Sequence, residues 1–163
     1  MILTDKEDFC KQVHLCEKAM YSLAFSLVKN DADAAEVISE SLFRAYKNRD
    51  TLKNEKAFKP WILRIVHNTA VEMIRKNSKI IPIEEFEDTA GESHENEVTT
   101  KLTLKKAVEA LKQPYRTVVV LFYYEDLSVS KIAQITDSNT VCVKQQLSRA
   151  RKMLKEALKG EFD

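Results

Sequence analysis

The chain has 163 residues, of which 44% are hydrophobic and 31% are charged, and its formal net charge is +1. This length fits one average domain or two small ones, and this composition excludes a chain that is disordered throughout. Two glycines and three prolines leave almost nothing to interrupt helix between Met1 and Ile80, which predicts an all-α fold. No apolar run approaches the roughly 20 residues that cross a bilayer, and the N-terminus lacks a signal-peptide pattern, so we expect a cytoplasmic protein.

The charges are segregated along the chain. Residues 1–78 carry 13 basic and 11 acidic side chains, residues 79–98 carry 1 and 7, and residues 99–163 carry 12 and 7. Residues 44–79 alone hold 10 basic and 3 acidic side chains, which is typical of a surface that binds phosphates. We therefore expect the two basic blocks to contact nucleic acid and the acidic segment between them to be solvated.

Three helices are predicted in the first half of the chain. The first covers Leu15 to Val28, and the second begins after a cap at Asn30 or Asp31 and carries apolar residues as far as Tyr46. The third covers residues 57–75, with Pro60 in its first turn. Apolar or small side chains recur along it at intervals of three and four, at Phe58, Trp61, Ile62, Ile65, Val66, Thr69, Ala70 and Met73.

Helical periodicity fails between Asn77 and Thr100, where acidic residues predominate, and this pattern predicts a flexible linker. Helix then resumes through Leu102, Leu104, Val108 and Leu111. Residues 115–124, after Pro114, fit either a buried strand or a buried helix. The lack of any partner strand favours the helix.

Residues 127–158 predict a short helix, a tight turn and a longer basic helix. Ser128 or Ser130 can cap the first helix, and Asp137-Ser138-Asn139 can form the turn. The second helix would bury Val141, Val143, Leu147, Ala150 and Leu154. Its outer face would carry Lys144, Gln145, Ser148, Arg149, Arg151, Lys152 and Lys155. Such side chains read a major groove in a helix-turn-helix, and a solvated basic helix in an ordinary bundle has the same pattern.

The sequence gives little support for a metal site or for a catalytic nucleophile. Cys10, His14 and Cys16 lie close enough together to suggest zinc, but no second ligand pair follows, so packing and surface roles compete with a metal site. The odd number of cysteines fits a reducing compartment. The three histidines lie outside any nucleophile pattern, and two glycines cannot build a phosphate-cradling loop. We expect no metal, no cofactor, no catalytic residue and no enzymatic activity.

Four segments, in order, resemble those of bacterial sigma factors. Ala34–Tyr46 and Phe58–Ala70 resemble sigma domain 2, whereas Ala110–Leu121 and Ser128–Arg151 resemble sigma domain 4. Only the acidic linker separates the two pairs, which leaves no room for other sigma domains. The chain is therefore similar to the extracytoplasmic-function (ECF, group 4) sigma factors of the sigma-70 family. It departs from the family pattern at Ser39, at Asp137, which replaces the turn glycine, and at Ser138; aspartate tolerates a left-handed turn better than most residues.

The resemblance implies sigma domain 2 at residues 1–78, an acidic linker at 79–100 and sigma domain 4 at 101–163. Domain 2 would bind the β′ clamp helices of core RNA polymerase and read the −10 promoter element, and domain 4 would contact the β flap and read the −35 element. The implied polymerase contacts are Glu36, Val37, Ser39, Glu40 and Phe43. The implied −10 contacts are Lys53, Lys56, Phe58, Arg64, Asn68 and Arg75. The implied −35 contacts are Lys144, Gln145, Ser148, Arg149 and Lys152.

The function implied is that of an alternative sigma factor, which directs promoter-specific transcription initiation of a stress or cell-envelope regulon. A membrane-anchored anti-sigma factor would hold it at the membrane. A free-standing helix-turn-helix regulator is the alternative, but it leaves the resemblances of Ala34–Tyr46 and Phe58–Ala70 to sigma domain 2 unexplained.

Several single residues also have alternative roles. Asn68 could read a flipped base or face solvent, and the apolar stripe favours Trp61 as a core residue over a base-stacking platform. Asp31 and Asp33 also fit a helix start, where acidic side chains are favoured.

Overall fold

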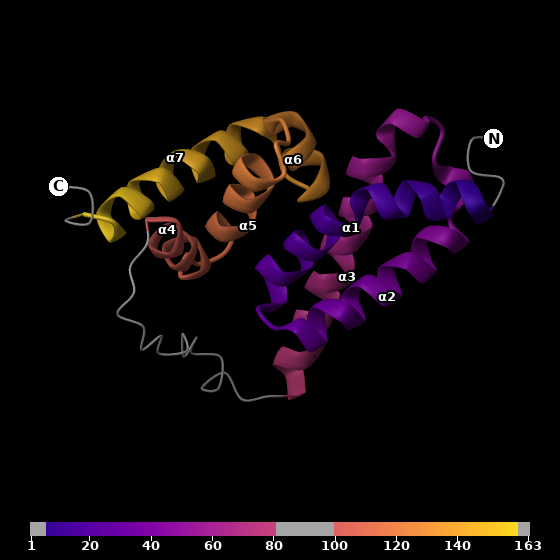
Figure 1. Ribbon diagram of the computed structural model, residues 1–163, viewed down its shortest axis with the longest axis horizontal. Helices are drawn as coiled ribbons and strands as arrows, with labels where there is room; N and C mark the ends of the chain where they lie inside the picture. The colour runs from indigo at the N-terminus through magenta and orange to yellow at the C-terminus, as the bar shows by residue number, and fades with distance from the viewer. Residues whose placement is uncertain (1–5, 81–99, 160–163) are drawn as a thin grey trace.

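The computed structural model describes residues 6–80 and 100–159, and every regular element in these two ranges is helical (Figure 1). The elements are α1 (Lys6–Val28), α2 (Asp31–Lys47), the 3-10 turns η1 (Arg49–Thr51) and η2 (Glu55–Ala57), α3 (Phe58–Ile80), α4 (Thr100–Glu109), α5 (Tyr115–Val119), the π-helical turn η4 (Val120–Tyr124), α6 (Val129–Ile135) and α7 (Thr140–Ala157). The all-α prediction is confirmed, and residues 115–124 are helical rather than a strand.

Helices α1, α2 and α3 form one bundle, which we call domain 2. The cap of α2 is Asn30, whose side chain accepts a hydrogen bond of 2.8 Å from the backbone N–H of Asp33. The three helices contact one another pairwise. Their shared core is formed by fully buried side chains such as Met20 and Leu23 from α1, Val37 from α2 and Ile62 from α3. Bulky apolar burial of this kind stabilises the bundle by about 1.5–3 kcal/mol for each large side chain.

The third predicted helix is present but longer than expected, because α3 runs to Ile80 instead of ending near residue 75. The predicted stripe lies inward, with Phe58, Ile62, Val66 and Ala70 buried. Leu63, outside that stripe, is also fully buried. Helix α3 therefore packs on more than one side, and its neighbours are α1, α2 and α6.

Helices α4 to α7 form the second bundle, which we call domain 4. Ser128 caps α6 by accepting a hydrogen bond of 3.2 Å from Lys131 N, and Asn139 caps α7 by accepting one of 2.8 Å from Cys142 N. The predicted inner stripe of α7 is buried at Val143, Leu147 and Ala150 and half-buried at Leu154. Val141 was assigned to that stripe wrongly, because its side chain is 65% exposed.

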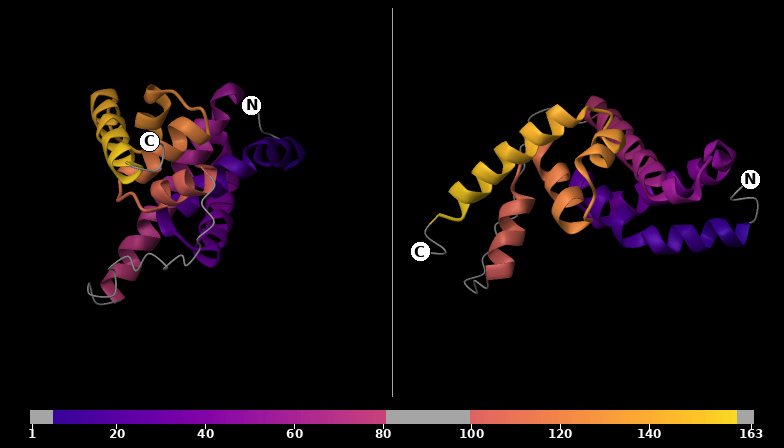
Figure 2. Two further views of the ribbon diagram at one scale, coloured as in Figure 1. Left: turned by 60° about the vertical axis from the view of Figure 1, so that its left-hand side comes forward. Right: turned by 90° about the horizontal axis from the view of Figure 1, so that it is seen from above.

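Domains 2 and 4 pack against each other (Figures 1 and 2). Helix α6 contacts α3, and both α5 and η4 contact α1. One continuous cluster of buried apolar side chains runs from Leu23 and Ile62 in domain 2 to Leu121 and Ile132 in domain 4. The predicted linker at 79–100 lies outside the described residues, except that α3 reaches Ile80 and α4 begins at Thr100.

Candidate nucleic-acid and polymerase interfaces

The turn between α6 and α7 has the backbone conformation that a helix-turn-helix requires. Asp137 has a left-handed backbone with φ of 56°, and Ser138 N donates a hydrogen bond of 2.9 Å to Ala133 O. This hydrogen bond and the left-handed residue before it end α6 as a Schellman motif does, and the left-handed residue of that motif is usually a glycine. Asp137 therefore occupies the left-handed position that the sequence predicted for it, and the helix-turn-helix geometry is kept.

The outer face of α7 is a row of exposed polar side chains, which we call the α7 face. All five residues predicted to contact the −35 element lie on it: Lys144, Gln145, Ser148, Arg149 and Lys152. Arg151 differs, because its Nε donates a hydrogen bond of 2.6 Å to the Tyr123 hydroxyl and its guanidinium lies beside the Phe122 and Tyr123 rings. The α7 face thus combines amide, hydroxyl and guanidinium groups that can pair with base edges and phosphates.

Val141 belongs to the α7 face, although its place in the apolar pattern predicted a core residue. It lies one turn before Gln145 and seven residues before Ser148, so the three share one side of the helix. An exposed aliphatic side chain at the start of a reading helix can contact the methyl group of thymine. The signal in the sequence was the two-residue step from Val141 to Val143, because two residues turn a helix by about 200° and so place the pair on opposite faces.

A second exposed face lies on α3 and carries three of the residues predicted to read the −10 element. Arg64, Asn68 and Arg75 are exposed and follow one another at steps of four and seven, which places them on one side of the helix. Lys53 and Lys56 are exposed in the loop that precedes α3. We call these five side chains the α3 face.

Phe58 was wrongly included among the −10 contacts. Its ring is only 1% exposed and lies edge-on to Phe9 at a centroid distance of 6.0 Å. Trp61, at 5.6 Å from the same ring, is half-buried and packs on the core, as its place in the apolar stripe predicted. Phe58 therefore supports the loop from inside the bundle and cannot reach DNA.

Arg64 is the point where the α3 face meets domain 4. Its Nη1 donates a hydrogen bond of 3.2 Å to Gln134 O, and its Nη2 lies 3.5 Å from Asp137 Oδ1. Beside it, burial lowers the pKa of His67, and the hydrogen bond to Asn68 and the charge of Asp137 offset part of that effect. His67 is therefore neutral at pH 7 and adds no charge to the α3 face.

Helix α2 presents a third, chemically different face, which we call the α2 face. Glu36, Ser39, Glu40 and Phe43 are exposed and lie along one side of the helix. Phe43 is 65% exposed, which is unusual for so large an apolar side chain. Glu40 accepts a hydrogen bond of 3.0 Å from Arg44, which also donates one of 2.6 Å to Glu72 on α3. The face is acidic and suited to a protein rather than to a phosphate backbone.

Val37 was wrongly included among the polymerase contacts, because it is fully buried in the domain 2 core. Asp31 and Asp33, at the start of α2, are used locally: Asp31 accepts a hydrogen bond from the Tyr21 hydroxyl, and Asp33 Oδ2 accepts one of 2.8 Å from Asn30. Asp33 therefore supports the start of α2, and Asp31, also in the first turn, links that turn to α1.

No group of three or more His, Cys, Asp or Glu side chains could hold a metal ion in the described parts of the chain. Cys10 is exposed and Cys16 is buried, and burial raises the pKa of the Cys16 thiol. No helix within residues 6–80 and 100–159 is long and apolar enough to span a membrane.

Two small helical domains, each with an exposed basic face and one with a helix-turn-helix, have the architecture that is typical of DNA-binding proteins. Comparison with known proteins makes this specific: the sigma-70 region 2 model matches residues 13–80, and the sigma-70 region 4 model matches residues 101–154. The chain belongs to the sigma-70 family of RNA polymerase sigma factors, in its ECF group. It acts in transcription initiation as an alternative sigma factor, not as a free-standing regulator.

Two relatives from Bacillus subtilis (strain 168) illustrate the similarity. The RNA polymerase sigma factor SigV is 35% identical, with 86% of this chain and 85% of SigV aligned. The ECF RNA polymerase sigma factor SigW is 25% identical, with 95% and 91% aligned.

Two solved structures share the fold. The sigma factor RpoE from Bartonella quintana, in complex with the anti-sigma factor NepR, has a TM-score of 0.75 and 24% identity, covering 94% of this chain and 98% of RpoE. CnrH, in complex with the cytosolic domain of CnrY, has a TM-score of 0.68 and 19% identity, covering 95% of this chain and 90% of CnrH.

Proposed function

We propose that three exposed faces divide the work of initiation: the α2 face binds core RNA polymerase, the α3 face reads the −10 element and the α7 face reads the −35 element. The observation that carries the proposal is the contrast between them. The α2 face is acidic with a protruding phenyl ring, whereas the α3 and α7 faces are basic and polar. DNA would be repelled by the first and attracted by the other two.

Polymerase binding by the α2 face rests on Phe43. An aromatic ring surrounded by polar groups is the usual anchor of a protein interface, because it buries a large apolar area at low entropic cost. Glu36 and Glu40 flank it and supply charges that can pair with basic residues of the β′ clamp helices. In domain 4, the exposed rings of Tyr123 and Tyr124 suit a contact with the β flap.

Replacing Phe43 with alanine should weaken binding to core polymerase about tenfold, because an interface anchor contributes more than about 1 kcal/mol. Folding should not suffer, since the ring is mostly solvent-exposed. The measurement is a titration of labelled protein with core polymerase. Leu15→Ala is the matched control, because Leu15 is a 77% exposed apolar side chain on α1. If Phe43→Ala and the wild-type protein bind core polymerase equally well, the assignment of the α2 face to the polymerase interface is wrong.

Promoter recognition combines two different readouts. The α7 face enters the major groove of duplex DNA at the −35 element, where its side chains pair with base edges. The α3 face, with Lys53 and Lys56 in its loop, holds phosphates around a −10 element whose bases leave the stack on melting. Asn68 offers an amide to a flipped base. The genes served, whether of a stress or an envelope regulon, would follow from run-off transcription over a genomic library.

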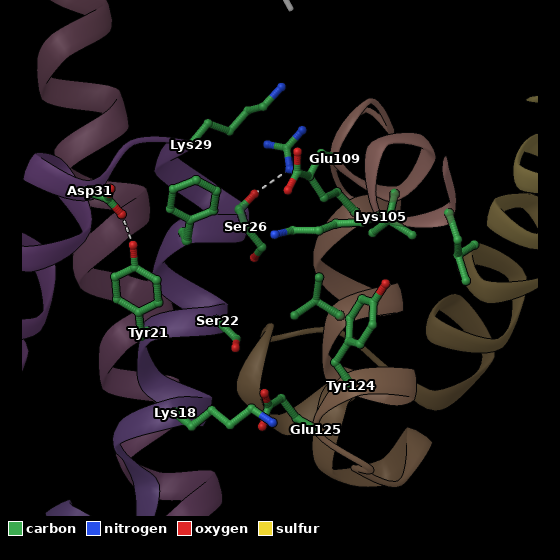
Figure 3. A pocket seen from close by; sticks show the side chains of 15 residues that line it. Lys18, Tyr21, Ser22, Ser26, Lys29, Asp31, Lys105, Glu109, Tyr124 and Glu125 are labelled. Carbon is green, nitrogen blue, oxygen red and sulfur yellow. Dashed lines mark hydrogen bonds between the residues drawn. The ribbon is translucent and has the colours of Figure 1, made fainter. Parts of the chain in front are cut away.

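The partner that restrains this protein is a membrane-anchored anti-sigma factor, which keeps it at the membrane until a signal arrives. A cleft of about 800 Å³ between α1 and domain 4 suits an amphipathic helix of that partner. Phe25, Val108 and Val120 supply apolar lining, and Figure 3 shows Lys18 and Glu109 among the charged groups around it. Apolar lining with a charged rim is the chemistry that helix-in-groove binding uses.

Inhibition by that partner should be competitive with core polymerase, because a helix seated between the domains would fix an arrangement that polymerase must change. The measurement is the binding of core polymerase to sigma factor co-expressed with candidate partners from the same operon. Raising the concentration of core polymerase should restore transcription and release the inhibitor. A stable ternary complex of sigma factor, inhibitor and core polymerase would contradict the competitive mechanism.

A further inference from the structure

Val141 is an apolar side chain at the centre of the α7 face. Successive residues of an α-helix are turned by about 100°, so positions along α7 can be compared by their angle around the helix axis. Measured from Val141, Ser148 lies at about −20° and Lys152 at about 20°. Gln145, one turn after Val141, lies at about 40°. Val141 therefore shares one side of the helix with side chains that are proposed to read the −35 element.

The exposure of Val141 agrees with this position. Val141 is 65% exposed, whereas Val143 and Leu147 pack in the core and are 0% and 2% exposed. Among the described residues of α7, Val141 is the only apolar side chain on the α7 face. A single exposed aliphatic group is common on an ordinary protein surface, but this one lies in the middle of a row of polar groups directed at DNA.

The place of Val141 along α7 also points to base edges. Helix α7 begins at Thr140, so Val141 is its second residue and lies at the end that follows the turn (Figure 1). The hydrogen bond of 2.8 Å from Cys142 N to the Asn139 side chain holds this first turn in its helical conformation. In a helix-turn-helix, the N-terminal residues of the second helix contact base edges. Val141 is therefore within reach of a base and not only of the phosphates.

We propose that Val141 selects a thymine in the −35 element by packing against its C5-methyl group. The proposal rests on the proposed assignment of the α7 face to that element, and it names a base that the face requires. In the major groove adenine, guanine and cytosine present hydrogen-bond donors and acceptors, whereas thymine adds an apolar methyl group. A valine side chain pairs with no donor or acceptor, so it would displace water from the other three edges without replacing the lost hydrogen bonds.

The spacing of Val141 and Gln145 limits where this thymine lies. Four helical residues span about 6 Å along the helix axis, which is about two base-pair steps of about 3.4 Å each. A glutamine amide pairs with N6 and N7 of adenine. The two side chains together therefore favour two A·T pairs within about two base pairs of each other, one read through the thymine methyl and the other through the adenine.

Replacing thymine with uracil removes only the methyl group and tests the proposal with the full chain bound to core polymerase. The template is the promoter that run-off selection identifies, with uracil placed at one thymine of its −35 element at a time. For the wild-type protein, one such replacement should lower transcription at limiting holoenzyme about fourfold, which corresponds to the loss of about 0.8 kcal/mol for one buried CH2-sized group.

Val141→Ala should transcribe the thymine and uracil templates equally well, because it lacks the two methyl groups that reach toward the base. Its fold should be intact, since the valine is exposed. Val141→Ile keeps the branched side chain and should keep the preference for thymine. Met153→Ala is the matched control: Met153 is a 41% exposed apolar residue of α7, but it lies about 18 Å further along the helix. This variant should show the wild-type ratio between the two templates.

The outcomes separate this proposal from the assignment of the α7 face. Wild-type transcription that is indifferent to uracil at every thymine, or a selected −35 element without an A·T pair, would overturn the role of Val141. A preference for thymine that survives in Val141→Ala would overturn it as well. If Arg149→Ala still relaxes base selection in any of these cases, the α7 face keeps its proposed function and only Val141 loses its role. If Arg149→Ala also leaves selection unchanged, the assignment of the α7 face fails.

Discussion

Arg149→Ala is expected to lower transcription from the preferred promoter roughly 10- to 100-fold. Arg149 lies at the middle of the α7 face, one turn after Gln145, and its side chain is exposed. A guanidinium there can pair with both acceptors of a guanine, and the loss of such a pair costs about 1–3 kcal/mol. Removal of an exposed side chain leaves the fold intact, so binding to core polymerase should be unchanged.

The readout that identifies a base contact is a change of preference, not only of strength. Run-off transcription over a library of −35 sequences should show relaxed selection at one base pair for Arg149→Ala. Arg151→Ala is the matched control, since its guanidinium is turned toward the Tyr123 hydroxyl and should not affect base preference. If Arg149→Ala and wild type select the same sequences with the same efficiency, α7 has been given the wrong role.

The helix-turn-helix is where sequence and structure agree most closely, and the reason is local. Capping by Ser128 and Asn139 and the left-handed turn at Asp137 depend on residues within a few positions of one another. The steps of three and four between Val143, Leu147 and Ala150 fix which side of α7 is buried. The one error, at Val141, came from treating an apolar residue as an inward one.

The errors in domain 2 have a different cause. Val37 and Phe58 lie within segments that resemble a binding motif, and such segments contain core residues as well as surface residues. Helical spacing separates the two kinds: Glu36, Glu40 and Phe43 share one side of α2, while Val37 and Ala45 are turned inward. The resemblance to a family motif therefore indicates which segment forms the functional helix, and the helical spacing of its residues indicates which of them are exposed.

The contact between the domains could not be predicted from the sequence. Arg64 follows no local pattern that would assign it to an interface, and Ser26 looks like an ordinary helical serine. Their burial or pairing depends on residues about 70 to 90 positions away along the chain. The length and composition of an acidic linker limit how far apart the two domains can lie, and they do not specify which surfaces of the domains pack together.

Asn68→Ala is expected to lower transcription from a fully paired promoter by about tenfold or more, with little loss of binding to closed duplex DNA. Its amide lies on the exposed side of α3, between Arg64 and Arg75. An amide that pairs with a base edge contributes about 1–3 kcal/mol, and the partner of Asn68 exists only after a base has left the stack. The substitution should therefore act on promoter opening.

A template mismatched across the −10 region removes the cost of unpairing, so it should rescue part of the activity lost by Asn68→Ala. The measurement compares paired and mismatched templates with the same core polymerase. Asn77→Ala is the matched control, because nine residues further along α3 places it on the opposite side of the helix. An equal defect on both templates would mean that Asn68 holds no flipped base, because loss of a general phosphate-binding surface lowers transcription from paired and opened DNA alike.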